Sequence, residues 1–247
     1  MIRNLGIPLV LFLACQKGGR LVDLRKDVEE KLNQGDTLAA ACSLLVGLSN
    51  PLISSSLVMG DVGAEELDSL SVNLISLLSS SGSASARAGD LPDSWNKAHI
   101  SLRITERYCD IKPAVAGRMI PMAVSALSAS AGASLLRAED IAHKGDTYGA
   151  ISLLEQSLSY LSTPLPHMGA SQALLPLYRE KAALCLAVGK LSEGMTVAEA
   201  VSVMGPPTGH DSVYAALSGD FYLMLSWDTV SALVRQDTVW ELVRAQR

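Results

Sequence analysis

The sequence is poor in aromatic residues and in positive charge. Phe, Trp and Tyr make up 4% of the 247 residues, whereas 49% of the residues are hydrophobic. Because strands draw on aromatic and β-branched side chains, this composition favours helices packed through small residues and hence a mostly α fold. The 25 Asp and Glu outnumber the 20 Lys and Arg, which leaves a net charge of −5. Nucleic-acid binding relies on clustered basic residues, so we expect no nucleic-acid partner.

Familiar catalytic motifs are missing as well. The sequence contains no GxSxG, HExxH, Walker or GxGxxG motif and no Asp-rich calcium loop. The adjacent carboxylates Glu29–Glu30 and Glu65–Glu66 would point about 100° apart on a helix, so they are expected to be solvated. We therefore predict no catalytic residue, no metal site and no cofactor, and a protein that is not an enzyme.

The four histidines do not form a recognisable site. His99 and His143 fall in helical segments without a His or Cys three or four residues away, which favours structural roles. His167 and His210 fall in segments rich in Pro and Gly. These segments are expected to be loops, where a functional role stays open.

The first 14 residues have the organisation of an export signal. A basic start at residues 1–4 precedes an apolar run, residues 5–14, that is too short to cross a bilayer as a helix. The order Leu-Phe-Leu-Ala-Cys, ending at Cys15, resembles the lipobox of bacterial lipoproteins, with Phe12 where Leu or Val is usual. The resemblance implies cleavage after residue 14, a lipid on Cys15 and, with Gln16 next, the periplasmic face of the outer membrane. The alternatives are an ordinary cleaved or uncleaved signal and a buried first helix or strand of a cytoplasmic protein.

Three cysteines remain after Cys15, namely Cys42, Cys109 and Cys185. They are far apart in the sequence and form no CxxC or other metal-ligand spacing. Cys42 and Cys185 stand in apolar helical stretches, where a free cysteine acts as a small buried hydrophobic residue. The alternative is one disulfide between two of the three, since an exported protein meets an oxidising environment.

A helix–turn–helix pattern occurs twice. Apolar residues recur at three- and four-residue spacing from Leu21 to Leu32, after which Gly35 should end the helix and Asp36 cap the next. The same order recurs at Gly145–Asp146, and each turn is followed by a helical segment with a Leu-Leu pair.

These pairs resemble tetratricopeptide-type repeats. The turn glycine is followed five positions later by a small residue, Ala40 or Ala150, which would let the two helices approach closely. Residues 177–190 are a third candidate, and the resemblance covers about half of the chain. It implies a helical-hairpin array over residues 15–190, while a generic antiparallel helix bundle is the alternative.

Other helices are expected between these pairs. They cover residues 64–78, a segment capped by Asp93 or Ser94, and residues 122–141. Residues 79–91, rich in Ser, Gly and Ala, and residues 163–169 are expected to be loops. The three tryptophans are expected to be packing anchors, and they are Trp95, Trp227 and Trp240.

The last segment, residues 191–247, changes character. Thr196 and Glu199 have the spacing of a capping box, and the helix they begin should stop before Pro206. Alternating apolar residues then predict short strands at 221–227, 230–234 and 239–243. Gly-Met-Thr, an acidic helix, Gly-Pro-Pro-Thr and short strands together resemble the SmpA/OmlA outer-membrane lipoprotein family over about residues 192–243. This implies a small α+β segment that contacts partner proteins of the outer-membrane assembly machinery; the alternative is a final repeat helix with a β-tail covering the helical stack.

Together these patterns predict a lipid-anchored envelope protein that binds other envelope proteins as a scaffold. The membrane contact would be made through the lipid on Cys15, and the sequence does not name the partner-binding residues. Two further hypotheses stay open, an envelope enzyme acting on cell-wall glycan and a substrate-capture subunit of a transporter.

Overall fold

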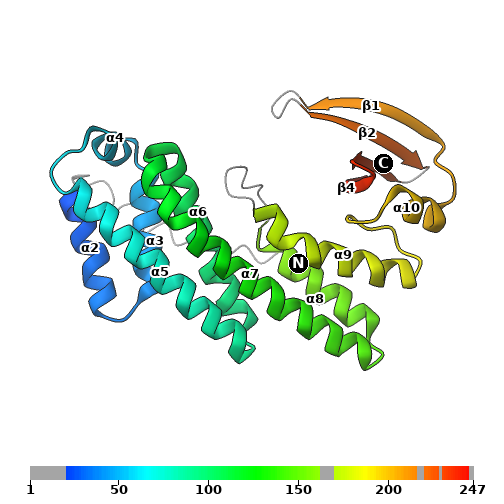
Figure 1. The fold of residues 1–247 in the computed structure, drawn as a ribbon, viewed down its shortest axis with the longest axis horizontal. Coiled ribbons are helices and arrows are strands. Elements are labelled where there is room, and N and C mark those ends of the chain that lie inside the picture. Colours follow the sequence, from blue (N-terminus) through cyan, green and yellow to red (C-terminus); the bar gives the residue numbers. More distant parts are fainter. Residues whose placement is uncertain (1–20, 162–169, 216–219, 228–229, 245–247) are drawn as a thin grey trace. The chain divides into compact units, whose positions relative to one another are not determined.

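A computed structural model describes residues 21–161, 170–215, 220–227 and 230–244 (Figure 1). The described chain is mostly helical and ends in a small four-stranded antiparallel sheet, which confirms the expected fold class. Its residues divide into two compact units, one up to Ser130 and one from Ala131 onward, whereas the sequence had suggested a boundary at residue 190. The elements are α2 (Leu21–Asn33), α3 (Thr37–Leu48), α4 (Pro51–Met59), α5 (Ala64–Ala88), α6 (Leu91–Ile111), α7 (Pro113–His143), α8 (Thr147–Ser159), α9 (Ala170–Ala187), α10 (Val197–Met204), β1 (Gly209–Ala215), β2 (Asp220–Trp227), β3 (Val230–Arg235) and β4 (Thr238–Arg244).

The first expected helical hairpin is present as α2 and α3. Gly35 has a φ of +78°, a left-handed conformation that favours glycine, and the Asp36 carboxylate accepts a hydrogen bond from the Ala39 amide at 2.9 Å. Ala40 is fully buried, as a close approach of two helices requires. The predictions for the helix end, the cap and the small interface residue are therefore confirmed.

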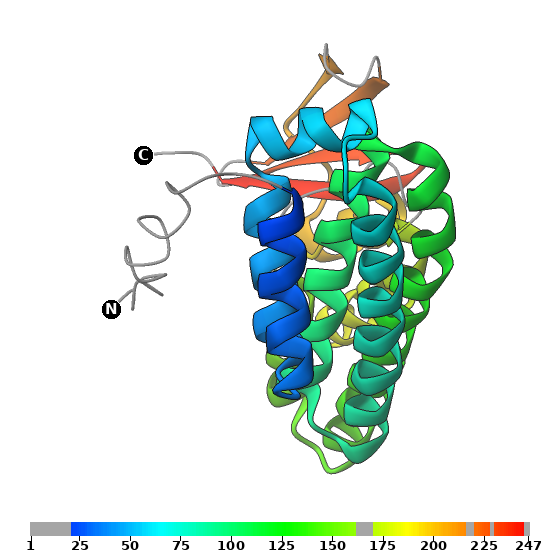
Figure 2. The ribbon, with the colours of Figure 1, turned by 90° about the vertical axis from the view of Figure 1, so that its left-hand side faces the viewer.

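The segment between the hairpin and α5 forms a helix that the sequence reading did not include. Pro51 begins α4, because proline in a first helical turn has no amide bond to lose, and Asn50 caps the helix. α4 is bent by 85° relative to α3. Figure 2 shows it lying across one end of the first unit.

The expected loop at residues 79–91 is wrong, because α5 continues to Ala88. Ser79 and Gly82 are buried, and Ser79 Oγ donates to the Met122 carbonyl of α7 at 2.8 Å. A Cβ atom at Gly82 would lie 3.2 Å from Lys97 Cβ on α6. Small residues here serve close helix packing, and a composition of Ser, Gly and Ala fits that role as well as it fits a linker.

The cap of α6 is Asp90 rather than Asp93 or Ser94. The Asp90 carboxylate accepts from the Asp93 amide at 3.2 Å. Ser94 is instead fully buried, and its hydroxyl bonds to that of Ser130 on α7 at 2.6 Å. The expected anchor Trp95 is buried, as predicted.

The expected helix at residues 122–141 is part of the longer α7. Among the described helices, α7 is long and apolar enough to cross a membrane by length and composition, and 39% of its most apolar window is buried within the fold. A core helix of a folded domain meets the same criteria. Met119, Ala123 and Leu127 of α7 belong to the buried core.

The second expected hairpin, α7 with α8, repeats the geometry of the first. Gly145 has a φ of +89°, and the Asp146 carboxylate accepts from the Gly149 amide at 2.8 Å. Buried hydroxyls join the two helices, since Ser157 Oγ donates to Ser134 Oγ at 2.9 Å. The third candidate segment, residues 177–190, lies in α9 and the turn after it, while residues 163–169 lie outside the described part.

The capping box at the start of α10 is confirmed. Thr196 Oγ1 accepts from the Glu199 amide at 3.2 Å, and Glu199 Oε2 accepts from the Thr196 amide at 2.8 Å. Strands β2, β3 and β4 match the three predicted strands, and β1 is an additional one. The strands are ordered β1-β2-β3-β4, each antiparallel to the next, and Gln236 and Asp237 both have positive φ in the turn before β4.

One face of the sheet packs on helices of the second unit. Its core includes Trp227, whose Nε1 donates to the Gly205 carbonyl at 2.9 Å. The prediction of a packing anchor is confirmed for Trp227 and wrong for Trp240, which is 53% exposed. The remaining members of this core include Ile151, Ala182, Cys185, Met195, Ala200, Leu225, Ala232, Val234 and Val239.

Candidate binding site

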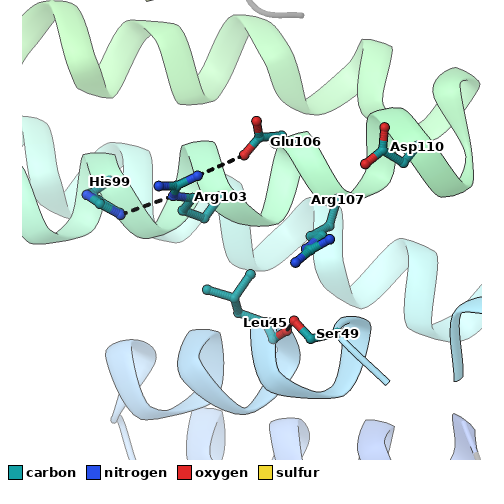
Figure 3. Close-up of a pocket in the computed structure, with 7 residues that line it drawn as sticks. All are labelled: Leu45, Ser49, His99, Arg103, Glu106, Arg107 and Asp110. Atoms are coloured by element: carbon teal, nitrogen blue, oxygen red, sulfur yellow. Dashed lines mark hydrogen bonds and ion pairs between the residues drawn. The ribbon is translucent and has the colours of Figure 1, made fainter. Parts of the chain in front are cut away.

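A groove lies between α3 and α6 of the first unit (Figure 3). Its volume is about 420 Å³. Both positive and negative side chains line it, together with one leucine and one serine. The lining residues are Leu45, Ser49, His99, Arg103, Glu106, Arg107 and Asp110.

The helical repeat explains why these residues share one groove. His99, Arg103 and Glu106 follow one another at four- and three-residue spacing, which places them on one side of α6. Trp95 and Tyr108 are buried in the core and hold α6 in place. On α3, Leu45 and Ser49 are one helical turn apart, so both reach the groove.

Arg103 is held by its neighbours on α6. Its Nη1 donates to Glu106 Oε2 at 3.1 Å, and its Nε donates to His99 Nε2 at 3.3 Å. A histidine nitrogen that accepts a hydrogen bond carries no proton, so this arrangement uses neutral His99. The Arg103 guanidinium is thus positioned by an acceptor on each side.

Arg107 differs from Arg103. Its side chain is exposed and extends from α6 toward Leu45 and Ser49 of α3 (Figure 3). Within the residues that the structure describes, it makes no hydrogen bond or ion pair. Ser49 is the C-cap of α3, and the carbonyl end of a helix favours a nearby cation. Arg107 therefore lines the groove with its five donors open to an acceptor from outside the chain.

A second surface feature lies on α4 and the turn that follows it. Leu52, Val58, Met59 and Val62 are 70%, 62%, 77% and 89% exposed. We refer to these four residues as the α4 patch. Ile53 and Leu57 on the other side of α4 are buried and attach the helix to the unit.

The residues singled out from the sequence are not brought together. Cys15 and His167 lie outside the described residues. His99 lines the groove, His143 ends α7, and His210 lies on the exposed strand β1 rather than in the expected loop. Within the described ranges, no group of three His, Cys, Asp or Glu side chains is placed to hold a metal ion.

The three described cysteines are all free thiols. Cys185 is buried as predicted, whereas Cys42 is exposed, because it lies on the side of α3 away from the buried face that includes Ala40, Leu44 and Leu48. Partial burial and, less strongly, the carboxylate of Asp36 raise the pKa of the Cys42 thiol. Partial burial likewise raises the pKa of the Cys109 thiol.

The sequence reading did not identify the groove or the α4 patch. The signal for the groove was the polar repeat on α6, but such repeats also occur on ordinary solvated faces. For the patch the signal is Pro51 followed by an apolar segment, a pattern that does not show which side of the helix stays exposed.

The turns and caps of the two hairpins are the structural features that relate to the resemblance to tetratricopeptide repeats. Turn glycines followed by capping aspartates occur in tetratricopeptide repeats and in other antiparallel helix pairs. The two hairpins share their caps and buried alanines, which supports internal similarity between them.

No family model, curated protein or solved structure matches this chain.

Proposed function

We propose that the chain is a lipid-anchored envelope protein that binds another envelope protein through the groove between α3 and α6. The observation that carries the binding role is Arg107, an exposed guanidinium that faces the groove with no bonding partner among the described residues. The lipid anchor rests on the sequence around Cys15. The resemblance to the SmpA/OmlA family agrees with both.

The chemistry of the groove favours a peptide segment that carries an acidic side chain next to an apolar one. A carboxylate would accept two parallel hydrogen bonds from Arg107, which is the geometry that a guanidinium recognises best. Leu45 would contact the apolar side chain, and Asp110 would repel a segment with two adjacent acids. The groove volume of about 420 Å³ is large enough for a few side chains.

The anchor and the binding site require separate tests. Metabolic labelling with palmitate should mark the wild-type chain in a host that processes bacterial lipoproteins, and a Cys15→Ala variant should stay unlabelled. An unlabelled wild-type chain would overturn the anchor.

To test the groove, a photoreactive side chain would replace Ser49 in one variant. A control variant would carry the same replacement at Lys26, an exposed position on α2. We expect a cross-linked protein from Ser49 and not from Lys26. Arg107→Glu should lower the yield at least severalfold, whereas Arg118→Glu, the same charge change at an exposed position on α7, should leave it unchanged. Equal yields from the two probe positions, or equal effects of the two charge reversals, would overturn the groove as the binding site.

A further inference from the structure

The α4 patch exposes apolar side chains on a helix that is attached to the unit by its other side. Its four side chains gather on one helix of nine residues and the turn that follows, and each is more than 60% exposed. Apolar side chains that are exposed singly need no explanation, but several on one short helix and its turn indicate a contact site. Because Ile53 and Leu57 attach the buried side of α4 to the unit, the position of its exposed side is fixed by the fold.

The patch lies beside the first turn of α2. A Cβ atom at Gly63, the residue after Val62, would lie 3.3 Å from Val22 Cγ2 and 3.8 Å from Leu21 Cβ. α4 crosses the end of the unit where α2 begins (Figure 2). The start of the described chain and the patch are therefore at the same end of the first unit.

The sequence places the proposed lipid close to this end. Cys15 is six residues before Leu21. Six residues span at most about 20 Å when fully extended. A bilayer that holds a lipid on Cys15 would therefore lie within about 20 Å of the first turn of α2, next to the patch.

We infer that the α4 patch is a second membrane contact, in which its four side chains enter the lipid surface beside the anchor. This inference rests on the proposed lipid anchor at Cys15. An acyl anchor and an apolar surface helix reinforce each other, because the anchor supplies a high local concentration of lipid and the helix adds buried apolar area. The first unit would then stand on the membrane by the end that carries α4.

The charges around the patch favour apolar insertion over attraction to anionic headgroups. Asp61, Glu65 and Glu66 are exposed on the turn and the first residues of α5. A contact driven by charge would require Lys or Arg at these positions. The contact should therefore survive high salt and should not depend on anionic lipid.

Photochemical labelling of the full lipidated chain in vesicles tests the inference. A photoreactive side chain replaces Met59 in one variant and Ala88 in another. Vesicles of phosphatidylcholine alone or with phosphatidylglycerol supply the lipid. Ala88 is exposed at the far end of α5, about 36 Å along the same helix from its first residue. We expect lipid adducts from Met59 at least severalfold above those from Ala88, in both vesicle types and at high salt.

A third chain carries the photoreactive group at Leu52 together with Val58→Ser and Val62→Ser. Both substitutions are at exposed positions, so the circular dichroism of the chain should not change. Removing two of the four apolar side chains should lower the lipid adduct at Leu52 by about tenfold.

The remaining outcomes separate this inference from the anchor. If the chain is labelled by palmitate but Met59 and Ala88 give equal lipid adducts, the anchor stands and the membrane contact is overturned. Adducts of Met59 with a second copy of the chain or with another protein, in place of lipid, would assign the patch to a protein interface and overturn it too. Absence of palmitate would remove the anchor, and with it the reason to place a bilayer at this end.

Discussion

An ion pair inside the first unit gives the sharpest test of how that unit is held together. Lys112 Nζ, from the C-cap of α6, lies 2.6 Å from Asp68 Oδ2 on α5. Asp68 is only 8% exposed, and its Oδ1 atom has no hydrogen-bond partner among the described residues. Lys112→Met would keep the aliphatic stem and remove the only cation paired with this carboxylate among the described residues. This change should lower the stability of the unit substantially, because it leaves a buried charge without compensation.

The magnitude follows from the burial of the two partners. At 2.6 Å and an effective dielectric constant near 20, the attraction is about 6 kcal/mol, most of which offsets the cost of removing the charges from water. Deleting the cation alone loses the attraction but keeps the cost for Asp68, so Lys112→Met should lower the free energy of unfolding by about 3 kcal/mol. Asp68→Asn should cost less, about 1 kcal/mol, because the more exposed Lys112 side chain can turn toward solvent.

Thermal unfolding followed by circular dichroism at pH 7 measures the difference. For a chain of this size, a loss of about 3 kcal/mol corresponds to a decrease in Tm of at least about 6 °C. The double variant Asp68→Asn/Lys112→Met should be more stable than Lys112→Met alone, since no buried charge remains. Lys190→Met serves as the matched control, because its ion pair with Glu155 at 3.1 Å is half exposed and should contribute less than about 1 kcal/mol.

Two results would refute the argument. If Lys112→Met unfolds at the temperature of the unaltered chain, the pair does not compensate a buried charge. If Asp68→Asn is the more damaging of the two single changes, the cost lies in a lost hydrogen bond and not in an uncompensated carboxylate.

Three other outcomes are expected. Burial raises the pKa of Tyr108 above its usual value of 10.0, so its contribution to stability is present below pH 10 and is lost as the pH rises further. Tyr108→Phe should flatten this alkaline loss of stability, measured by urea titrations at a series of pH values. An unchanged loss would contradict the assignment to Tyr108. Thr196→Ala removes one half of a capping box and should lower the stability of the second unit by about 1 kcal/mol, and an unaltered melting curve would show that the cap is dispensable. A maleimide should label exposed Cys42 but not buried Cys185 in the native chain. The labelling rate should rise about tenfold per pH unit from pH 7, because the raised pKa of Cys42 keeps the thiolate scarce. Equal labelling of the two cysteines would contradict the difference in their burial.

Local signals in the sequence were sufficient for the hairpins and for α10. Gly35 and Gly145 adopt left-handed backbone conformations, and Asp36 and Asp146 cap the next helix within three residues. The capping box at Thr196 is equally local. Such features are predictable because each rests on atoms that are close in the chain as well as in space.

Features that depend on distant partners could not be obtained this way. Whether residues 79–88 form a linker or a helix depends on α6 and α7, which pack against Ser79 and Gly82. The exposure of Trp240 depends on which face of β4 the helices cover. Composition does not distinguish these cases, since a small residue suits both a flexible segment and a tight interface.

The sequence alone therefore determined the helical class, the turns and caps of the two hairpins and of α10, and three of the four strands, because periodicity and capping act over a few residues. Only the tertiary structure decided which surfaces stay open. The groove exists because α3 and α6 lie side by side, and the α4 patch is exposed because Ile53 and Leu57 take the buried side of that helix. Both are products of contacts between segments that are distant along the chain, and no short stretch of sequence encodes them.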